Sequence, residues 1–174
     1  MVRPSTVRLN EHAQRLSEHL KHPDVSLREH VESKMGALSI HVLQRRRVYL
    51  DTRYWLILRD VAMGRPRRAG DVALLAALRR WVQAGVIVCP LGDGSLLEVL
   101  RQSDETTRLA TARLIDELSL GVTIQNAQDR LTTEVMHFML RAQTPGAKMV
   151  PPLESVWLKA AYALGVLHLS LIHI

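Results

Sequence analysis

Short apolar strands alternate with longer helices from Arg47 onward, and this alternation restricts the fold more than any other feature of the sequence. Strands are expected at residues 48–51, 86–89 and 122–124, and each is followed by a segment with helical character. Strands that are separated by helices pair in parallel, because the helix carries the chain back across the sheet. We therefore predict an α/β fold: a Rossmann-like, three-layer α/β/α domain with a parallel sheet.

Local signals mark the ends of the expected helices. Asp71 is expected to cap a helix whose apolar residues recur with the period of an α-helix, and Gly85 is expected to end it. The other expected helices cover residues 53–63, 95–102, 104–119 and 128–141, with a last helix that runs from Pro152 through Leu164. The sequence shows no internal repeat.

Residues 1–46 differ from this α/β pattern, and we expect them to form a basic, histidine-rich helical leader. Ser26 and Glu29 have the spacing of a capping box, which predicts that a helix begins there. His12 and His19 could share one helical face, either as metal ligands or as part of a solvated polar face, and the solvated face is favoured. Met35 is an alternative start of the reading frame.

The last six residues, 169–174, match the in-frame translation of a transposon-end adapter used in DNA library preparation. We therefore expect a non-native tail at 169–174 and an incomplete α/β domain at 47–168, from which C-terminal strands are missing. The alternative is a natural apolar tail.

Two acidic residues follow the first two expected strands. Asp51 closes the first strand, and Glu98 lies near the start of the helix after the second. Ligands bind at the carboxyl ends of the strands in open α/β folds. Two carboxylates that meet there repel one another unless a cation lies between them, and Mg²⁺ and Mn²⁺ prefer oxygen ligands. The pair predicts a divalent-metal site, at which the ion would activate water and stabilise charge on a phosphodiester.

Both carboxylates also have purely structural interpretations. Ser95 and Glu98 have capping-box spacing, so Glu98 could serve only the backbone amide of Ser95. Asp51 could likewise cap the helix that follows it. Their positions after successive strands favour the chemical interpretation.

The segment Val48-Tyr-Leu-Asp51-Thr52, the apolar second strand, and Ser95-Leu-Leu-Glu98 at the start of the next helix resemble the PIN-domain nucleases. The resemblance extends over residues 47–168. It implies a Rossmann-like sheet with three or four acids around Mg²⁺ or Mn²⁺, and cleavage of single-stranded RNA. Asp51 matches the first acid and Glu98 the second. Many bacterial members of the family are toxins that a cognate antitoxin neutralises.

The same resemblance suggests a third acid and one departure. Glu154 begins a helix with small residues behind it, as the third acid does, although the helix dipole alone would also favour a glutamate there. The fourth acid normally follows the next strand, which we expect to start at Val166 and to be cut off by the tail. Arg53 stands where the family often has Asn or Ser, so it either contacts phosphate or lies on the solvent face.

The charge of the chain suits a polyanionic partner. The net charge is +6 and the pI is near 10.1. Arg65, Arg67 and Arg68 form a basic loop that could hold an RNA backbone, and Arg79 and Arg80 could do the same. The alternative is a solvated surface without a partner.

Several other sites are disfavoured. The Gly92-Asp-Gly94 segment lacks the third glycine of a dinucleotide-binding loop. A haloacid-type phosphatase would need a second aspartate at position 53. Tyr54 and Trp55 could stack on a base, but burial of Trp55 is favoured. Cys89 is expected to pack as a small apolar residue.

The sequence therefore predicts a metal-dependent endoribonuclease, and the alternative is a PIN-like module that binds RNA or protein without cutting. The expected partners are RNA, an antitoxin protein and, in a homo-oligomer, a second copy of the chain. Cys89 is the only cysteine, no secretory signal is visible, and no clean apolar run reaches about 18 residues. These features predict a cytoplasmic location and no membrane partner.

Overall fold

The computed structural model describes residues 24–146 and 151–160. The chain divides into two compact units, Met1–Ala37 and Leu38–Ile174. The second unit thus begins earlier in the chain than the predicted domain start at Arg47. His12, His19 and the expected tail at 169–174 lie outside the described residues.

The predicted capping box at Ser26 is confirmed. The Glu29 carboxylate accepts hydrogen bonds from the backbone N–H and the hydroxyl of Ser26, both at 2.9 Å, and the Glu29 N–H donates to the Ser26 hydroxyl at 3.2 Å. This reciprocal bonding satisfies amides that have no partner inside the helix. Helix α2 (Leu27–Leu43) follows directly.

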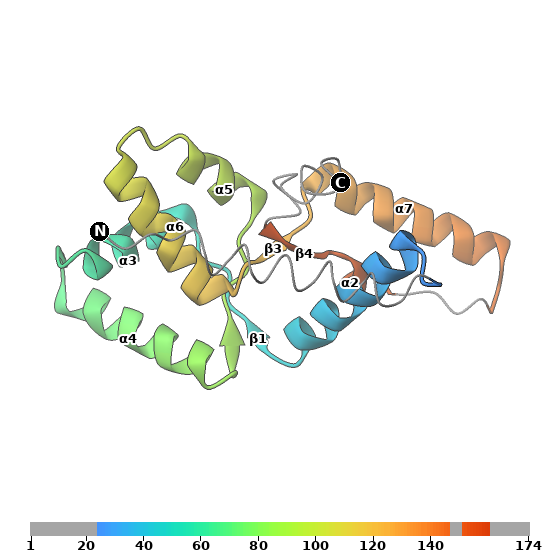
Figure 1. The fold of residues 1–174 in the computed structure, drawn as a ribbon, viewed down its shortest axis with the longest axis horizontal. Coiled ribbons are helices and arrows are strands. Elements are labelled where there is room, and N and C mark those ends of the chain that lie inside the picture. Colours follow the sequence, from blue (N-terminus) through green and yellow to red (C-terminus); the bar gives the residue numbers. More distant parts are fainter. Residues whose placement is uncertain (1–23, 147–150, 161–174) are drawn as a thin grey trace. The chain divides into compact units, whose positions relative to one another are not determined.

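Most described residues of the second unit are helical (Figure 1). Its further elements, in chain order, are β1 (Arg46–Arg47), α3 (Thr52–Ala62), α4 (Ala69–Gln83), β2 (Ile87–Val88), α5 (Asp93–Leu100), α6 (Glu105–Ser119), β3 (Val122–Ile124), α7 (Ala127–Gln143), α8 (Pro152–Ser155) and β4 (Trp157–Lys159). The helices expected at 53–63, 104–119 and 128–141 are confirmed within two residues at each end. Helix α4 begins at Ala69, so Asp71 lies inside its first turn and the prediction that it is the cap is wrong.

The strands form two pairs. Strand β1 pairs with β2 in parallel, as predicted, and β3 pairs with β4 antiparallel. An isolated parallel bridge between Leu91 and Thr123 connects the two pairs. The first strand pairs through Arg46 and Arg47, earlier in the chain than predicted. Only Val48 extends this pairing, by a hydrogen bond from its N–H to the Val88 carbonyl at 2.9 Å. The α/β prediction therefore holds as a mixed, mostly helical fold with a small parallel sheet.

The end of the described chain differs from the prediction. A helix was expected to run from Pro152 through Leu164, but helix α8 ends at Ser155 and the chain then forms β4. This strand pairs with β3, and the pairing buries Trp157 to 5% exposure. A large β-favouring side chain gains more from this burial than from one further helical turn.

Two groups of buried side chains form the core. The larger cluster is built mainly by helices α3, α4, α5 and α6, which pack on the residues of β2 and just beyond it. It includes Trp55, Leu58 and Leu118, each with no exposed surface. The smaller cluster joins α2 to the strands. Its members are Val42, Val88, Val122 and Trp157.

An ion pair connects two of the helices in the larger cluster. The guanidinium of Arg79 on α4 donates two parallel hydrogen bonds, at 2.8 and 2.9 Å, to the Glu117 carboxylate on α6. Arg79 therefore has a structural partner, and an RNA backbone would have to compete with Glu117 for it. Among the described helices, none is both long and apolar enough to cross a membrane.

Candidate functional site

One surface pocket gathers most of the residues that the sequence singled out. Its volume is about 460 Å³, and it lies at the start of α3, the basic loop, the first turn of α4, and α5. The residues that line it are Asp51, Thr52, Arg53, Leu56, Ile57, Arg67, Arg68, Asp71 and Glu98. The structure therefore brings the first and second predicted acids, Asp51 and Glu98, to one site.

Asp51 occupies the N-cap position of α3, but its side chain makes no capping hydrogen bond. Its backbone carbonyl accepts from the N–H groups of Tyr54 at 2.8 Å and Trp55 at 3.3 Å, as the carbonyl of an N-cap residue does. The exposed carboxylate is therefore not used to cap the start of the helix. This weakens the interpretation of Asp51 as only a cap.

Glu98 lies in the second half of α5 and not at its start. The helix begins at Asp93 with Gly92 as the N-cap, so the capping box predicted for Ser95 and Glu98 is absent from α5. Glu98 is exposed and faces the pocket. The structural interpretation of Glu98, in which its carboxylate only accepts a hydrogen bond from the Ser95 backbone amide, is therefore wrong.

A side-chain hydrogen bond connects the two helices that carry these acids. The hydroxyl of Thr52, in the first turn of α3, donates to the hydroxyl oxygen of Ser95 on α5 at 3.0 Å. Ser95 is only 3% exposed. A bond between residues 43 positions apart fixes the start of α3 against α5, and thus one wall of the pocket against another.

Asp71 also lines the pocket, although it was not among the predicted site residues. It contributes a third carboxylate to the pocket lining from the first turn of α4. No sequence signal could have placed it there, because its nearness to Asp51 depends on the packing of α4 against α3. The helix dipole favours an acid at this position on its own.

Glu154 is placed differently. It is exposed on α8 and does not line the pocket with Asp51 and Glu98. Within the described ranges, no three His, Cys, Asp or Glu side chains are grouped closely enough to hold a metal ion. The third-acid role of Glu154 stays a prediction. Proteins commonly hold Mg²⁺ by one or two carboxylates, while water and substrate oxygens complete its coordination, so a metal role for Asp51 and Glu98 stays a prediction.

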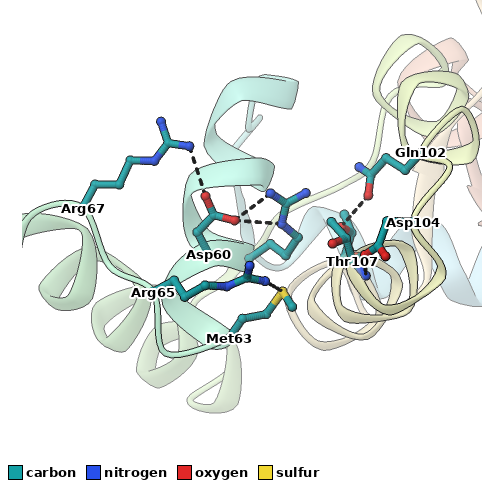
Figure 2. A network of polar contacts seen from close by, with 9 residues as sticks. Asp60, Met63, Arg65, Arg67, Gln102, Asp104 and Thr107 are labelled. Carbon is teal, nitrogen blue, oxygen red and sulfur yellow. Dashed lines mark hydrogen bonds and ion pairs between the residues drawn. The ribbon is translucent and has the colours of Figure 1, made fainter.

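The arginines of the basic loop differ in their surroundings. Arg67 and Arg68 line the pocket, whereas Arg65 does not. The Arg65 guanidinium instead lies 3.0 Å from the sulfur of Met63 (Figure 2). Of the three predicted RNA-binding residues, two are therefore placed to meet a phosphate in the pocket.

Asp60 anchors the basic loop to α3. Its carboxylate accepts from Arg59 at 2.6 Å. It also accepts from the exposed side chain of Arg67 at 3.2 Å, as Figure 2 shows. Burial raises the pKa of Asp60, but the hydrogen bonds and charges of these two arginines outweigh that effect and hold the pKa below its usual value. The carboxylate is therefore ionised, and it orients Arg67 beside the pocket.

Arg53 and the two aromatic residues after it lie in different environments. Arg53 is exposed but lines the pocket, so the structure places it where a phosphate could reach it. Tyr54 is 48% exposed. Trp55 is fully buried in the larger cluster, as predicted, and cannot stack on a base.

The disfavoured sites gain no support. A side chain at Gly92 would come within 2.9 Å of the Tyr49 hydroxyl, so the tyrosine ring explains this glycine without a bound dinucleotide.

Cys89 is buried in the core, and burial raises the pKa of its thiol to about 11. A thiol that stays protonated at neutral pH is a poor nucleophile, as expected of a packing residue.

No protein family matches the sequence, and no solved structure matches the chain.

Proposed function

We propose that the pocket at Asp51 and Glu98 is the active site of a metal-dependent endoribonuclease that cleaves single-stranded RNA. One observation carries the proposal: two exposed carboxylates from different helices line one pocket together with three arginines. Carboxylates suit a divalent cation, and guanidinium groups suit phosphate. A site with both can hold an RNA backbone and the ion that acts on it.

Each side chain has a distinct role in this proposal. Asp51 and Glu98 would hold Mg²⁺ or Mn²⁺. Bound there, the ion would supply an activated water and stabilise charge on the phosphodiester. Arg67 and Arg68 would bind the phosphates on either side of the scissile bond, and Arg53 would contact the RNA backbone from the start of α3. The proposal includes a PIN-like, three-layer arrangement of the complete domain, and the resemblance to toxins implies an antitoxin protein as a partner.

The test is a cleavage assay on single-stranded RNA with Mg²⁺ or Mn²⁺. Asp51→Asn and Glu98→Gln should each lower the cleavage rate by about 100-fold or more, since loss of even an outer-shell partner of a metal commonly costs about 10–100-fold. EDTA should abolish cleavage. Glu105→Gln, at an exposed carboxylate in the first turn of α6, is the matched control and should cleave at the wild-type rate.

Wild-type cleavage by Asp51→Asn would overturn the site. Glu154→Gln belongs in the same series, because a drop in its rate would assign the third acid to a residue that does not line the pocket.

A non-catalytic module that binds RNA is the second candidate. It is favoured by the absence, across residues 24–146 and 151–160, of a three-residue group that could hold a metal. Such a module would bind labelled single-stranded RNA equally well in EDTA. Binding would fall when Arg53, Arg67 and Arg68 are changed to alanine, and no cleavage would appear with either metal.

A further inference from the structure

Helix α7 presents its apolar side to solvent. None of its residues is buried. Leu131 is 61% exposed, Val135 46% and Phe138 73%. Exposed apolar residues that occur singly are normal, but a continuous row of them on one helix marks a contact surface.

The opposite side of the same helix faces the rest of the unit. Thr133 and His137 are the half-buried residues of α7, and they lie one turn apart. The Thr133 hydroxyl lies 3.4 Å from the side-chain oxygen of Gln125, just before the helix. At 100° per residue, these two positions point away from Leu131 and Val135. The helix therefore turns Thr133 and His137 inward and leaves the stripe through Leu131, Val135 and Phe138 exposed, the reverse of a helix that serves only its own core.

The apolar stripe has the spacing of a coiled-coil seam. Leu131, Val135, Phe138 and Ala142 are separated by four, three and four residues, which is the alternation of a and d positions. Paired with an antiparallel copy of itself, the seam matches large residues with smaller ones. Phe138 then faces Val135 of the second copy, and Leu131 faces Ala142 of the second copy.

The charges beside the seam select the same arrangement. Glu134 and Arg141 are exposed and lie seven residues apart, so both flank the seam on one side. In the antiparallel pair, each Glu134 lies across from Arg141 of the second copy, and the contact occurs twice. In a parallel pair, Glu134 would lie across from Met139 of the second copy and would find no opposite charge.

We propose that α7 is a self-association surface, through which two copies of this chain pair as antiparallel helices. The match of both size and charge to a second copy is what identifies the occupant. The proposal is independent of any nuclease activity, because no residue of α7 lines the pocket.

Analytical ultracentrifugation of the full chain tests the proposal. The wild-type chain should reach a dimer as its concentration rises. Phe138→Glu should weaken the dimer by at least about tenfold, since it places a charge in the centre of the seam. Met136→Glu is the matched control: Met136 is 49% exposed on the same helix but lies outside the seam, and its variant should dimerise normally.

A charge exchange distinguishes the antiparallel pair from any other contact. Glu134→Arg and Arg141→Glu should each weaken self-association by about tenfold, because each variant brings like charges together twice. An equal mixture of the two variants should restore the dimer, since every contact in the mixed pair then joins opposite charges. Both positions are exposed, so these variants should keep the wild-type helical circular dichroism.

Four results would overturn the proposal. One is a wild-type chain that stays monomeric at its highest soluble concentration. The second is a dimer that Phe138→Glu leaves intact, and the third is a dimer that the mixture of charge variants fails to restore. The fourth is loss of the folded state in Phe138→Glu, which would assign the face to another segment of the same chain.

Discussion

The hydroxyl groups of Thr52 and Ser95 hold together the two helices that carry the pocket carboxylates. Ser95 is buried, so its hydroxyl oxygen has little access to water and depends on the 3.0 Å bond from Thr52. Buried polar groups that lose their partner cost more than the bond itself contributes. These two small side chains therefore matter for both stability and the shape of the pocket.

Thr52→Val should lower the free energy of unfolding by about 1–2 kcal/mol, because it leaves the buried Ser95 hydroxyl without its donor. It should also weaken Mn²⁺ binding if Asp51 and Glu98 hold the ion, whereas Thr52→Ser should retain both properties. Urea unfolding and Mn²⁺ titration measure the two effects. Equal behaviour of the valine and serine variants would show that the hydroxyl bond has no such role.

Asp60 gives the chain a pH-dependent contribution to stability. The pKa of Asp60 in the folded chain lies below the usual aspartate value. A depressed folded pKa stabilises the fold above the unfolded pKa, about 3.9, and this stabilisation is lost as the pH falls through the folded value. Asp60→Asn should therefore cost about 1–3 kcal/mol at pH 7 and progressively less below about pH 4.

Urea unfolding of wild type and Asp60→Asn across that pH range measures the difference. Glu105→Gln, at an exposed site, is the control and should change stability little at any pH. A constant cost of Asp60→Asn from pH 7 to pH 3 would contradict the ion-pair explanation.

Among the secondary-structure elements, β4 depends most on a distant partner. Its residues pair with β3, 33 to 37 positions earlier in the chain. Trp157 contributes the largest side chain of the smaller core cluster. The element should therefore be stable only while that cluster is formed.

Trp157→Ala should lower the free energy of unfolding by about 3–5 kcal/mol, because it removes a large buried ring and leaves a cavity. Leu153→Ala, at a residue that is 57% exposed on α8, should change it by less than about 0.5 kcal/mol. Urea unfolding monitored by circular dichroism compares the two. A small cost for Trp157→Ala would mean that β4 is not packed on β3 in solution.

For the whole molecule, the predictable features are those with local causes. Helix α6 was predictable because its start has a local cause. Asp104, a residue type that favours the N-cap position, accepts a hydrogen bond from the Thr107 N–H at 2.7 Å. Strand β4 was not predictable, since residues 157–159 become a strand only by meeting β3. In the same way, strand order predicted that Asp51 and Glu98 would share a site. The position of Asp71 in that site was not predictable, because it depends on the packing of α4 on α3.

The buried side chains of the described residues fall into two clusters, so we expect the parts of the fold built on them to open separately. The pocket is built on α3, α4 and α5, whose buried side chains belong to the larger cluster. Strands β3 and β4 rest on the smaller one and meet the rest of the sheet through the bridge at Leu91. Their amide protons should exchange with solvent before those of α3 and α6 do. The strand pair can open and close again while the carboxylates and arginines of the pocket keep their places.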